Sequence, residues 1–349
     1  MNKIYYIGHS SEGFNDGGHS RNKAFREYFV QKKAEIVPVY SANYFVRFGF
    51  LLAVLKSMLF SKNNTFFIHQ GTLLVLFPLP FLHYHLIRSA VFWLLQHTSN
   101  SNEVTIEVND LPYEQAKDLE LSTPKITKVF QDKLYALKNT KYIFASHEMG
   151  KYVSDTFKLD YEVIINGSNE LANYFGSEKL QPCFSSTETK FIYVGGLNKG
   201  RQIEALLTHF NNRSEILILM GEWGEWLADY ELSKNIFYIG KFKEDYAHYL
   251  TSKCDIGLIP YNSSRFYYNI CYPTKASFYI TAGIPFLSTP LVELKNIFEK
   301  TGLVYFVPFE DWGTFITNFN TSRLPAIKEK IAVEKHNFYW EKLLRKTVL

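Results

Sequence analysis

The sequence contains FIYVGGLNKGR at residues 191–201 and CYPTKASFYITAGIP at residues 271–285. Each segment places small or turn-forming residues and cationic side chains beside the expected start of a helix. Small residues there let a ligand approach backbone N–H groups, and the helix dipole favours an anion. A cation in the first turn adds a charge-assisted contact to phosphate oxygens. Two such segments in one half of the chain predict a diphosphate held from two sides.

The first segment is typical of a strand, a turn and a helix start. Gly195 and Gly196 let the backbone approach a ligand, and Lys199 and Arg201 can meet phosphate oxygens. The alternative is an ordinary turn whose charges are solvated. No GxGxxG occurs here or after the first expected strand, so the dinucleotide fingerprint is lacking.

The second segment predicts a short helix over about residues 274–282. Pro273 suits its first position, Gly283 its C-terminal cap, and Pro285 stops it. Its N-terminus offers Thr274 and Lys275 to a ligand. A polar aromatic loop precedes it, with Arg265, Tyr267, Tyr268, Asn269 and Tyr272. A purely structural helix would explain the caps but not this loop.

Expected strands alternate with helical stretches along the whole chain, which predicts parallel sheets covered on both faces. The first six are at residues 3–8, 35–40, 65–70, 103–110, 141–147 and 161–167. After a polar linker candidate at 169–189, six more follow at 190–196, 215–221, 235–242, 254–261, 284–289 and 303–308. We therefore expect two Rossmann-like, doubly wound α/β domains at 1–167 and 168–325, facing a cleft. Residues 326–349 are expected to be helical and to pack back on the first domain.

The composition of the chain excludes some classes of function. The 349 residues suffice for two domains, and a formal charge of +4 without a basic cluster is too mild to indicate nucleic acid. Cys183, Cys254 and Cys271 have no metal-ligand or CxxC spacing. A reduced, cytoplasmic setting is the expectation.

The chain has two apolar stretches, at residues 44–60 and 73–96. Their composition is compatible with a protein core, a membrane surface or a membrane span. The second is interrupted by Pro78, Pro80 and Arg88, whereas a spanning helix needs roughly 20 mostly apolar residues. We weigh buried core first, contact with a membrane surface second and a true span last.

The ordered set of motifs resembles the GT-B glycosyltransferases over nearly the whole chain. In the second half the order is YVGGLNKGRQIEALL, LILMG, NIFYIGKF, CDIGLIPY and YPTKASFYITAGIPFLST. The first half adds DGGHSR, IEVNDL, IFASHEMGKYV and IINGSNEL, and the chain closes with NFYWEKLL. The resemblance implies two facing domains and a terminal helix that returns to the first.

The resemblance also implies site residues. It assigns the donor diphosphate to Gly195, Lys199, Arg201, Thr274 and Lys275, and the nucleobase to Gly240, Lys241 and Phe242. Gly17 and Gly18 would approach donor or acceptor from the first domain, and Arg265, Asn269, Tyr272 and Pro273 belong to the donor loop. Many retaining members carry two glutamates where this chain has Ile270 and Phe278. Without them the pattern PxKxSxYxxxGxP resembles that of bacterial galactofuranosyl- and glucosyltransferases of surface-glycan assembly.

Sugar transfer requires a neutralised leaving diphosphate and a deprotonated acceptor hydroxyl. Cations and helix N-termini achieve the first, and the chain has no Asp-x-Asp, so no metal or other cofactor is expected. For an inverting route the base candidates are Asp110, then Glu107, with His19 among the loop histidines. Each of these base candidates has an alternative role without catalysis, as a helix cap or as a structural residue.

The resulting expectation is a cytoplasmic, metal-independent glycosyltransferase. It would move a sugar from a nucleotide diphosphate to a glycan or polyprenyl-linked glycan in surface polysaccharide assembly. If region 44–96 follows the second of its interpretations, it would contact the inner face of the membrane. A homo-oligomer is compatible with the sequence, and no nucleic-acid partner is expected. The alternatives are a non-catalytic GT-B partner subunit and a nucleotide-sugar 2-epimerase.

Overall fold

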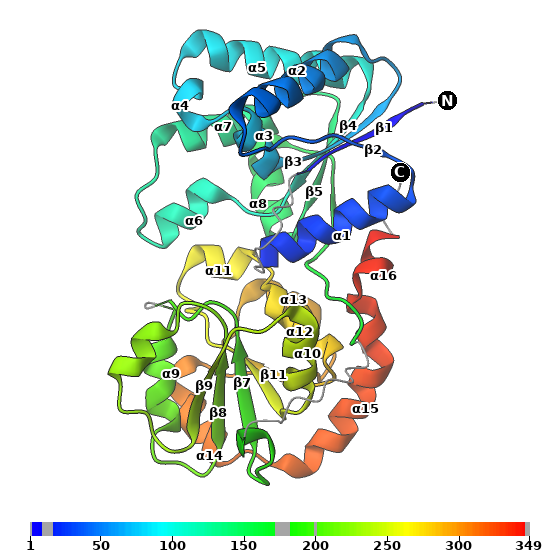
Figure 1. The fold of residues 1–349 in the computed structure, drawn as a ribbon. Coiled ribbons are helices and arrows are strands. Elements are labelled where there is room, and N and C mark those ends of the chain that lie inside the picture. The colour runs from blue at the N-terminus through cyan, green and yellow to red at the C-terminus, as the bar shows by residue number, and fades with distance from the viewer. Residues whose placement is uncertain (1, 9–16, 172–181, 199–200, 346–349) are drawn as a thin grey trace. The chain divides into compact units, whose positions relative to one another are not determined.

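The structure is a computed structural model that describes residues 2–8, 17–171, 182–198 and 201–345. The chain divides after Ile165 into two compact units. Each unit contains one six-stranded parallel sheet with helices around it (Figure 1). The predicted class, two Rossmann-like α/β domains, is confirmed.

The sheet of the first unit has the order β2-β1-β3-β4-β5-β6, and every pair is parallel. Its strands are β1 (Ile4–Ile7), β2 (Glu35–Ile36), β3 (Thr65–His69), β4 (Glu103–Val108), β5 (Thr140–Phe144) and β6 (Tyr161–Val163). The direction of travel reverses between β1 and β3. The carboxyl ends of these two strands therefore border the crevice at which such sheets bind ligands.

Helices cover both faces of this sheet because right-handed crossovers place α1 on one face and the helices after β2 on the other. They are α1 (Gly17–Gln31), α2 (Tyr44–Phe60), α3 (Gln70–Leu76), α4 (Leu79–Leu82), α5 (His85–Ser101), α6 (Pro112–Asp118), α7 (Lys125–Tyr135) and α8 (His147–Phe157). The α1 side is aromatic: Phe29 packs against Tyr6 and Phe67 with ring centroids 4.9 and 4.6 Å away.

The second sheet has the order β12-β11-β10-β7-β8-β9, also entirely parallel. Its strands are β7 (Lys190–Val194), β8 (Ile216–Met220), β9 (Ile236–Gly240), β10 (Ile256–Ile259), β11 (Phe286–Ser288) and β12 (Val304–Phe306). This is the dinucleotide-binding strand order, and its reversal lies between β7 and β10. β8 is buried along its whole length, as expected of a strand covered on both faces.

The helices of this unit are α9 (Ile203–Phe210), α10 (Glu244–Ser252), α11 (Phe266–Ile270), α12 (Thr274–Thr281), α13 (Val292–Phe298), α14 (Trp312–Thr317), α15 (Leu324–Glu334) and α16 (Trp340–Leu344). Short 3-10 turns are η1 (Pro182–Phe184), η2 (Glu225–Asp229), η3 (Phe309–Asp311), η4 (Thr321–Arg323) and η5 (Lys335–Phe338). On one side of the sheet, buried Phe191 and Leu217 pack with Phe210 and Trp312.

Every strand expected from the sequence is present, and each ends earlier than expected, whereas β5 begins one residue earlier, at Thr140. The predicted helix at 274–282 is α12, which ends at Thr281 with Gly283 at a φ of +87°. One detail differs: Pro273 is the extended N-cap and not the first helical residue. The first-turn N–H groups have no side-chain cap, because proline has no side-chain acceptor, and that of Ala276 donates to the Pro273 carbonyl at 2.9 Å.

The end of the chain is hydrogen-bonded to the beginning of the second unit. Ser168 N–H donates to the Phe338 carbonyl at 3.0 Å, and Trp340 N–H donates to the Ser168 carbonyl at 3.0 Å. The described part of residues 326–349 is grouped with the second unit. The predicted packing of this segment on the first domain stays a prediction.

We predict that Gly221→Ala destabilises the second unit. Gly221 has a φ of +153°, and a Cβ there would lie 1.9 Å from the Gly195 carbonyl oxygen. The strands must separate to admit it, which costs about 1–3 kcal/mol. Urea unfolding followed by circular dichroism measures the change.

Gly49→Ala is the matched control. A Cβ there meets nothing within 4 Å, and Gly49 lies inside α2. This substitution should raise stability by about 0.5–1 kcal/mol. Equal stabilities of the two variants would contradict the close approach of β8 to the Gly195 turn.

Candidate functional sites at the two sheet edges

The second unit has its candidate site at the carboxyl ends of β7 and β10, where its strand order reverses. The turn after β7 begins with Gly195, which has a φ of +132°. Its N–H donates to the Met220 carbonyl at 2.9 Å, which holds the turn against β8. A Cβ on Gly195 would lie 3.4 Å from Lys275 Nζ. The two sequence segments therefore meet at this point.

Lys275 is a buried cation without a hydrogen-bonding partner. Within the described residues, its Nζ has no acceptor. It instead faces two aromatic rings, 3.9 Å from the Tyr193 centroid and 4.9 Å from the Tyr261 centroid. Burial and the nearby Arg201 lower the pKa of Lys275 well below its ordinary value. Ring faces compensate part of a buried charge but do not satisfy three N–H donors, so this ammonium is suited to receive an anion.

Arg201 is the second cation of this cluster. Its side chain is half-buried and hydrogen-bonded to Tyr193. Burial disfavours its charge, but Tyr261, Tyr193 and Tyr268 outweigh this and raise the pKa of Arg201. No carboxylate within the described ranges forms an ion pair with Arg201 or Lys275. Two neighbouring cations without a counter-charge give a local excess of positive potential.

The N-terminus of α12 adds backbone donors to this excess. Thr274 is its first residue and is half-buried, and Lys275 follows in the same turn. The N–H groups of these two residues have no side-chain cap, and the positive end of the helix dipole favours negative charge. Lys199, the other cation predicted from this loop, lies outside the described residues. Gly195, Arg201, Thr274 and Lys275 thus form one cluster, which we call the cationic site.

Other predicted donor residues have structural contacts. The Asn269 side chain donates to the carbonyls of Ser263 and Arg265 at 2.7 and 2.9 Å and fixes the loop before α12. Tyr272 is buried, and its hydroxyl lies 2.8 Å from Ser277 Oγ. The Tyr272 carbonyl accepts from Asn166 at 3.0 Å. These residues, with N-cap Pro273, position α12; direct contact with a donor stays a prediction.

The positions predicted for the nucleobase lie at the end of β9. Gly240 has a φ of +80° and open space around it. Lys241 forms an ion pair with Glu222, and the Phe242 ring packs edge-on against Tyr246 at 5.2 Å. Trp223, which sequence reasoning missed, has a strained φ of +60° and a half-exposed indole packed over Gly196. Bulky residues rarely adopt this conformation without a functional or packing reason.

The two positions at which the resemblance to GT-B glycosyltransferases would place glutamates hold apolar residues. Ile270 is buried, and the Phe278 ring lies 4.7 Å from that of His248. Burial lowers the pKa of His248 to about 4, so the imidazole is neutral at pH 7. This neutral pair fills part of the space beside α12 in place of a carboxylate.

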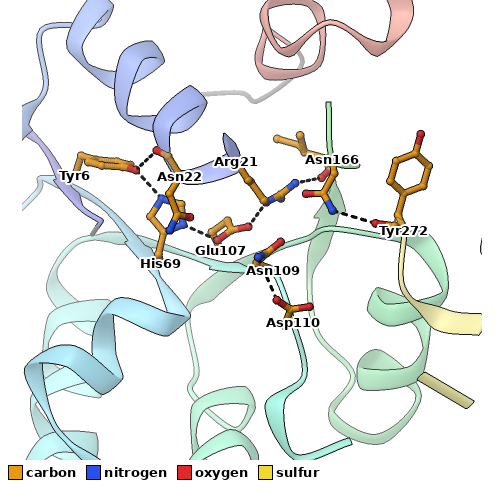
Figure 2. A network of polar contacts seen from close by, with 10 residues as sticks. Tyr6, Arg21, Asn22, His69, Glu107, Asn109, Asp110, Asn166 and Tyr272 are labelled. Atoms are coloured by element: carbon orange, nitrogen blue, oxygen red, sulfur yellow. Dashed lines mark hydrogen bonds and ion pairs between the residues drawn. The ribbon is translucent and has the colours of Figure 1, made fainter. Parts of the chain in front are cut away.

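The first unit has a buried polar chain at its own reversal point, next to β1, β3 and β4 (Figure 2). Glu107 Oε1 accepts from Arg21 Nε at 2.5 Å, and Oε2 lies 2.6 Å from His69 Nδ1. His69 Nε2 is 2.7 Å from the Tyr6 hydroxyl. The register of the sheet explains the histidine contact, because His69 of β3 pairs with Glu107 of β4.

Glu107 is ionised within this chain. Burial alone would raise the pKa of its carboxyl, but the charges and hydrogen bonds of Arg21 and His69 outweigh it and lower the pKa to about 2. Arg21 also donates to the Ile164 carbonyl at 2.7 Å, which connects α1 to the segment after β6. Both carboxylate oxygens of Glu107 are occupied, so its contacts are those of a structural anchor. Its role as a base stays a prediction.

Asp110 lies two residues beyond β4 and is half-buried. Its Oδ2 accepts from Asn109 Nδ2 at 3.2 Å, and its carbonyl accepts from Gln70 at 3.3 Å. It is therefore more accessible than Glu107, at the same sheet edge (Figure 2). Gly17, Gly18 and His19 form the first turn of α1. Of the catalytic candidates, Asp110 and Glu107 thus lie on one strand end.

Sequence reasoning also missed Tyr193, Tyr261, Arg21 and His69. The tyrosines stand in quoted motifs, YVGG and IPY, but their contact with Lys275 depends on which faces of β7 and β10 meet α12. Within the described residues, no three His, Cys, Asp or Glu side chains gather to bind a metal. The same residues include no helix long and apolar enough to cross a bilayer.

We predict that Glu107→Gln destabilises the protein by about 3–5 kcal/mol at pH 7, because it leaves the buried Arg21 guanidinium without its counter-charge. The folded pKa of about 2 lies below the ordinary value of 4.5. The carboxylate therefore stabilises fully above pH 4.5, and its contribution is lost as the pH falls towards 2.

Urea unfolding at several pH values checks this prediction. The gap between wild type and Glu107→Gln should narrow below about pH 4.5. Glu103→Gln is the control, because Glu103 begins the same strand and is exposed. A gap that is independent of pH would exclude the ionised state of Glu107 as the cause.

Comparison with known proteins gives structural similarity only. No protein-family model and no curated protein sequence matches the chain. Solved structures do match. They include sucrose-phosphate synthase from Thermosynechococcus elongatus (TM-score 0.65, 12% identity, 99% of this chain and 97% of that chain). WaaG, a glycosyltransferase involved in lipopolysaccharide biosynthesis, has a TM-score of 0.61 at 10% identity, with 99% of both chains covered.

A third similar structure is Anabaena HepE in complex with UDP-glucose. Its TM-score is 0.62 at 12% identity, and the match covers 99% of this chain and 98% of that chain. These matches span both units, and the two parallel sheets agree with them. The chain therefore has the GT-B fold of these glycosyltransferases.

Proposed function

We propose that the protein is a glycosyltransferase that uses a nucleotide-diphosphate sugar as donor. The observation that carries the proposal is the buried, unpartnered Lys275 ammonium beside Gly195, Arg201 and the N-terminus of α12. An uncompensated buried cation is costly, and it is retained where a ligand supplies the missing charge. A diphosphate carries that charge and has oxygens enough for both cations.

The same residues supply the chemistry that the donor side needs. Negative charge grows on the diphosphate as the bond to the sugar carbon breaks. A preorganised ammonium, guanidinium and helix N-terminus stabilise that charge without reorganising. We therefore propose that transfer requires no metal ion.

The nucleoside is proposed to lie along the ends of β8 and β9. Gly240 leaves open space there, and the half-exposed Trp223 indole offers a flat apolar surface. HepE, which shares the fold, was solved with UDP and with UDP-glucose. A uridine diphosphate donor is thus the first to test.

The acceptor is proposed to be a glycan or a polyprenyl-linked glycan of a bacterial-type surface polysaccharide. Asp110 is the proposed base, since its carboxylate lies at the strand end and is only half-buried. Taking the proton from an acceptor hydroxyl would let that oxygen attack the sugar carbon as the diphosphate leaves. We propose a cytoplasmic location for this reaction.

One observation favours a second function, that of a non-catalytic GT-B partner subunit. Glu107 is occupied on both oxygens, and the Ile270 and Phe278 positions hold no carboxylate. Such a subunit would bind a nucleotide or glycan without turnover. Release of nucleotide diphosphate from UDP-sugars by the purified chain separates the two.

We predict that Lys275→Met weakens UDP binding by roughly 10- to 100-fold, because a charge-assisted contact contributes about 1.5–3 kcal/mol. The same change should leave the melting temperature equal or higher, since it removes a buried, unpaired charge. Calorimetry with UDP and thermal unfolding without ligand measure the two effects.

Lys253→Met is the control, because Lys253 is an exposed lysine over the Tyr249 ring in the same unit. It should change neither UDP affinity nor turnover. Unchanged UDP affinity in both Lys275→Met and Arg201→Ala would remove the diphosphate assignment. A large loss of stability in Lys275→Met would instead indicate a structural lysine.

We predict that Asp110→Asn lowers turnover at least 100-fold and leaves UDP affinity within twofold, as expected of a base that does not touch the diphosphate. The measurement is nucleotide release with an acceptor extract, beside UDP calorimetry. Asp118→Asn, at the end of α6, is the control. Full turnover by Asp110→Asn would move the search for the base to His19 or Glu107.

A further inference from the structure

We propose that the outer surface of α2 and α5 binds an anionic lipid bilayer. We call this surface the α2–α5 face and define it by exposed Phe45, Phe48, Leu52 and Phe60 on α2 and Leu86 and Trp93 on α5. The inference rests on the shape and charge of this face alone and does not depend on the nucleotide site.

The apolar residues of α2 form a continuous outer stripe. Phe45, Phe48, Leu52 and Phe60 follow the spacing of one helical face, with Lys56 between them. Phe45 is 89% exposed and Phe60 is 76% exposed. The opposite side of the helix is also apolar, with Val54 and Met58 fully buried. A helix whose outer face is mostly apolar, like its inner face, is matched to an apolar environment on its outer side as well.

α5 continues the same surface. Thr98 Oγ1 donates to the Met58 carbonyl at 3.3 Å, and His97 Nε2 lies 3.2 Å from the Leu59 carbonyl, so the helices are in contact. Figure 1 shows α2 and α5 side by side at the edge of the first unit. Leu86 is 83% exposed, and the Trp93 indole stacks on His97 at 5.3 Å. The exposed apolar residues thus form one patch across two helices.

The charges of residues 36–102 indicate what binds to the α2–α5 face. No Asp or Glu occurs from residue 36 to residue 102, although the whole chain has 34 of them. The same stretch contains Arg47, Lys56, Lys62 and Arg88. Lys56 and Lys62 are exposed at and beyond the α2 stripe. A protein partner or a second copy imposes no such exclusion of acidic residues, whereas an anionic headgroup layer repels every one of them.

The positions of apolar and basic residues on the α2–α5 face also fit the boundary between headgroups and acyl chains. Interfacial helices bury an apolar face at the boundary of headgroups and acyl chains and extend their lysines to phosphate groups. Aromatic residues such as Trp93 prefer that boundary. Within the described residues no helix can span, so the predicted contact lies in the plane of the surface.

Flotation with phosphatidylglycerol–phosphatidylcholine vesicles tests the proposal. The full chain should bind vesicles rich in phosphatidylglycerol, bind pure phosphatidylcholine at least 10-fold less, and dissociate as salt rises. Phe45→Ser with Phe48→Ser and Leu52→Ser should lower binding at least 10-fold. Lys56→Gln with Lys62→Gln should lower it roughly 25-fold, about fivefold per lysine.

Matched controls change the same chemistry elsewhere. Val30→Ser with Leu121→Ser and Val333→Ser removes three exposed apolar residues outside the face. Lys151→Gln with Lys300→Gln removes two exposed lysines outside it. Both control variants should bind vesicles as the wild type does.

Three outcomes would overturn the proposal. They are no binding of the wild type to anionic vesicles, equal losses in face and control variants, and a wild-type dimer that the triple serine variant abolishes without vesicle binding. The last outcome would assign the face to a second copy of the chain. UDP calorimetry on the same samples reports the nucleotide site separately, so a failure of one proposal is distinguishable from a failure of the other.

Discussion

The reversal of strand order in a parallel sheet is the constraint on which both candidate sites depend. Where neighbouring strands carry their crossovers in opposite directions, the loops at their carboxyl ends diverge and leave space. In the second unit this happens between β7 and β10, which brings Gly195 and Lys275 together from segments far apart in the sequence. In the first unit it happens between β1 and β3, where Tyr6 meets His69.

The two reversal points differ in whether their buried charges have counter-charges. Around Glu107 every charge has a partner, and the carboxylate is shared between a guanidinium and an imidazole. Around Lys275 the contacts are ring faces, and burial together with the neighbouring Arg201 lowers the pKa of the ammonium. A buried network whose charges are all paired makes the fold more rigid. A buried charge without a counter-charge can instead bind a ligand of opposite charge.

Sequence periodicity was sufficient for the architecture because each strand is a short apolar run bounded by turn residues. The cationic site was also largely predictable, since Gly195, Arg201 and Lys275 stand in segments with recognisable caps. The buried chain of the first unit was not, because His69 and Glu107 meet only through the register of β3 with β4. Register is a tertiary property, and no local pattern around either residue encodes it. The same holds for the rings of Tyr193 and Tyr261 around the Lys275 ammonium.

The hydrogen bonds between Ser168 and the segment around Tyr339 have a consequence for modularity. The second unit begins and ends at one place, because Ser168 pairs with both Phe338 and Trp340. A unit whose entry and exit are adjacent can be exchanged between chains as a single cassette, and it tolerates new termini elsewhere on its surface. Evolution can thus replace the second unit as a block, leaving the first unit to diverge at its own rate.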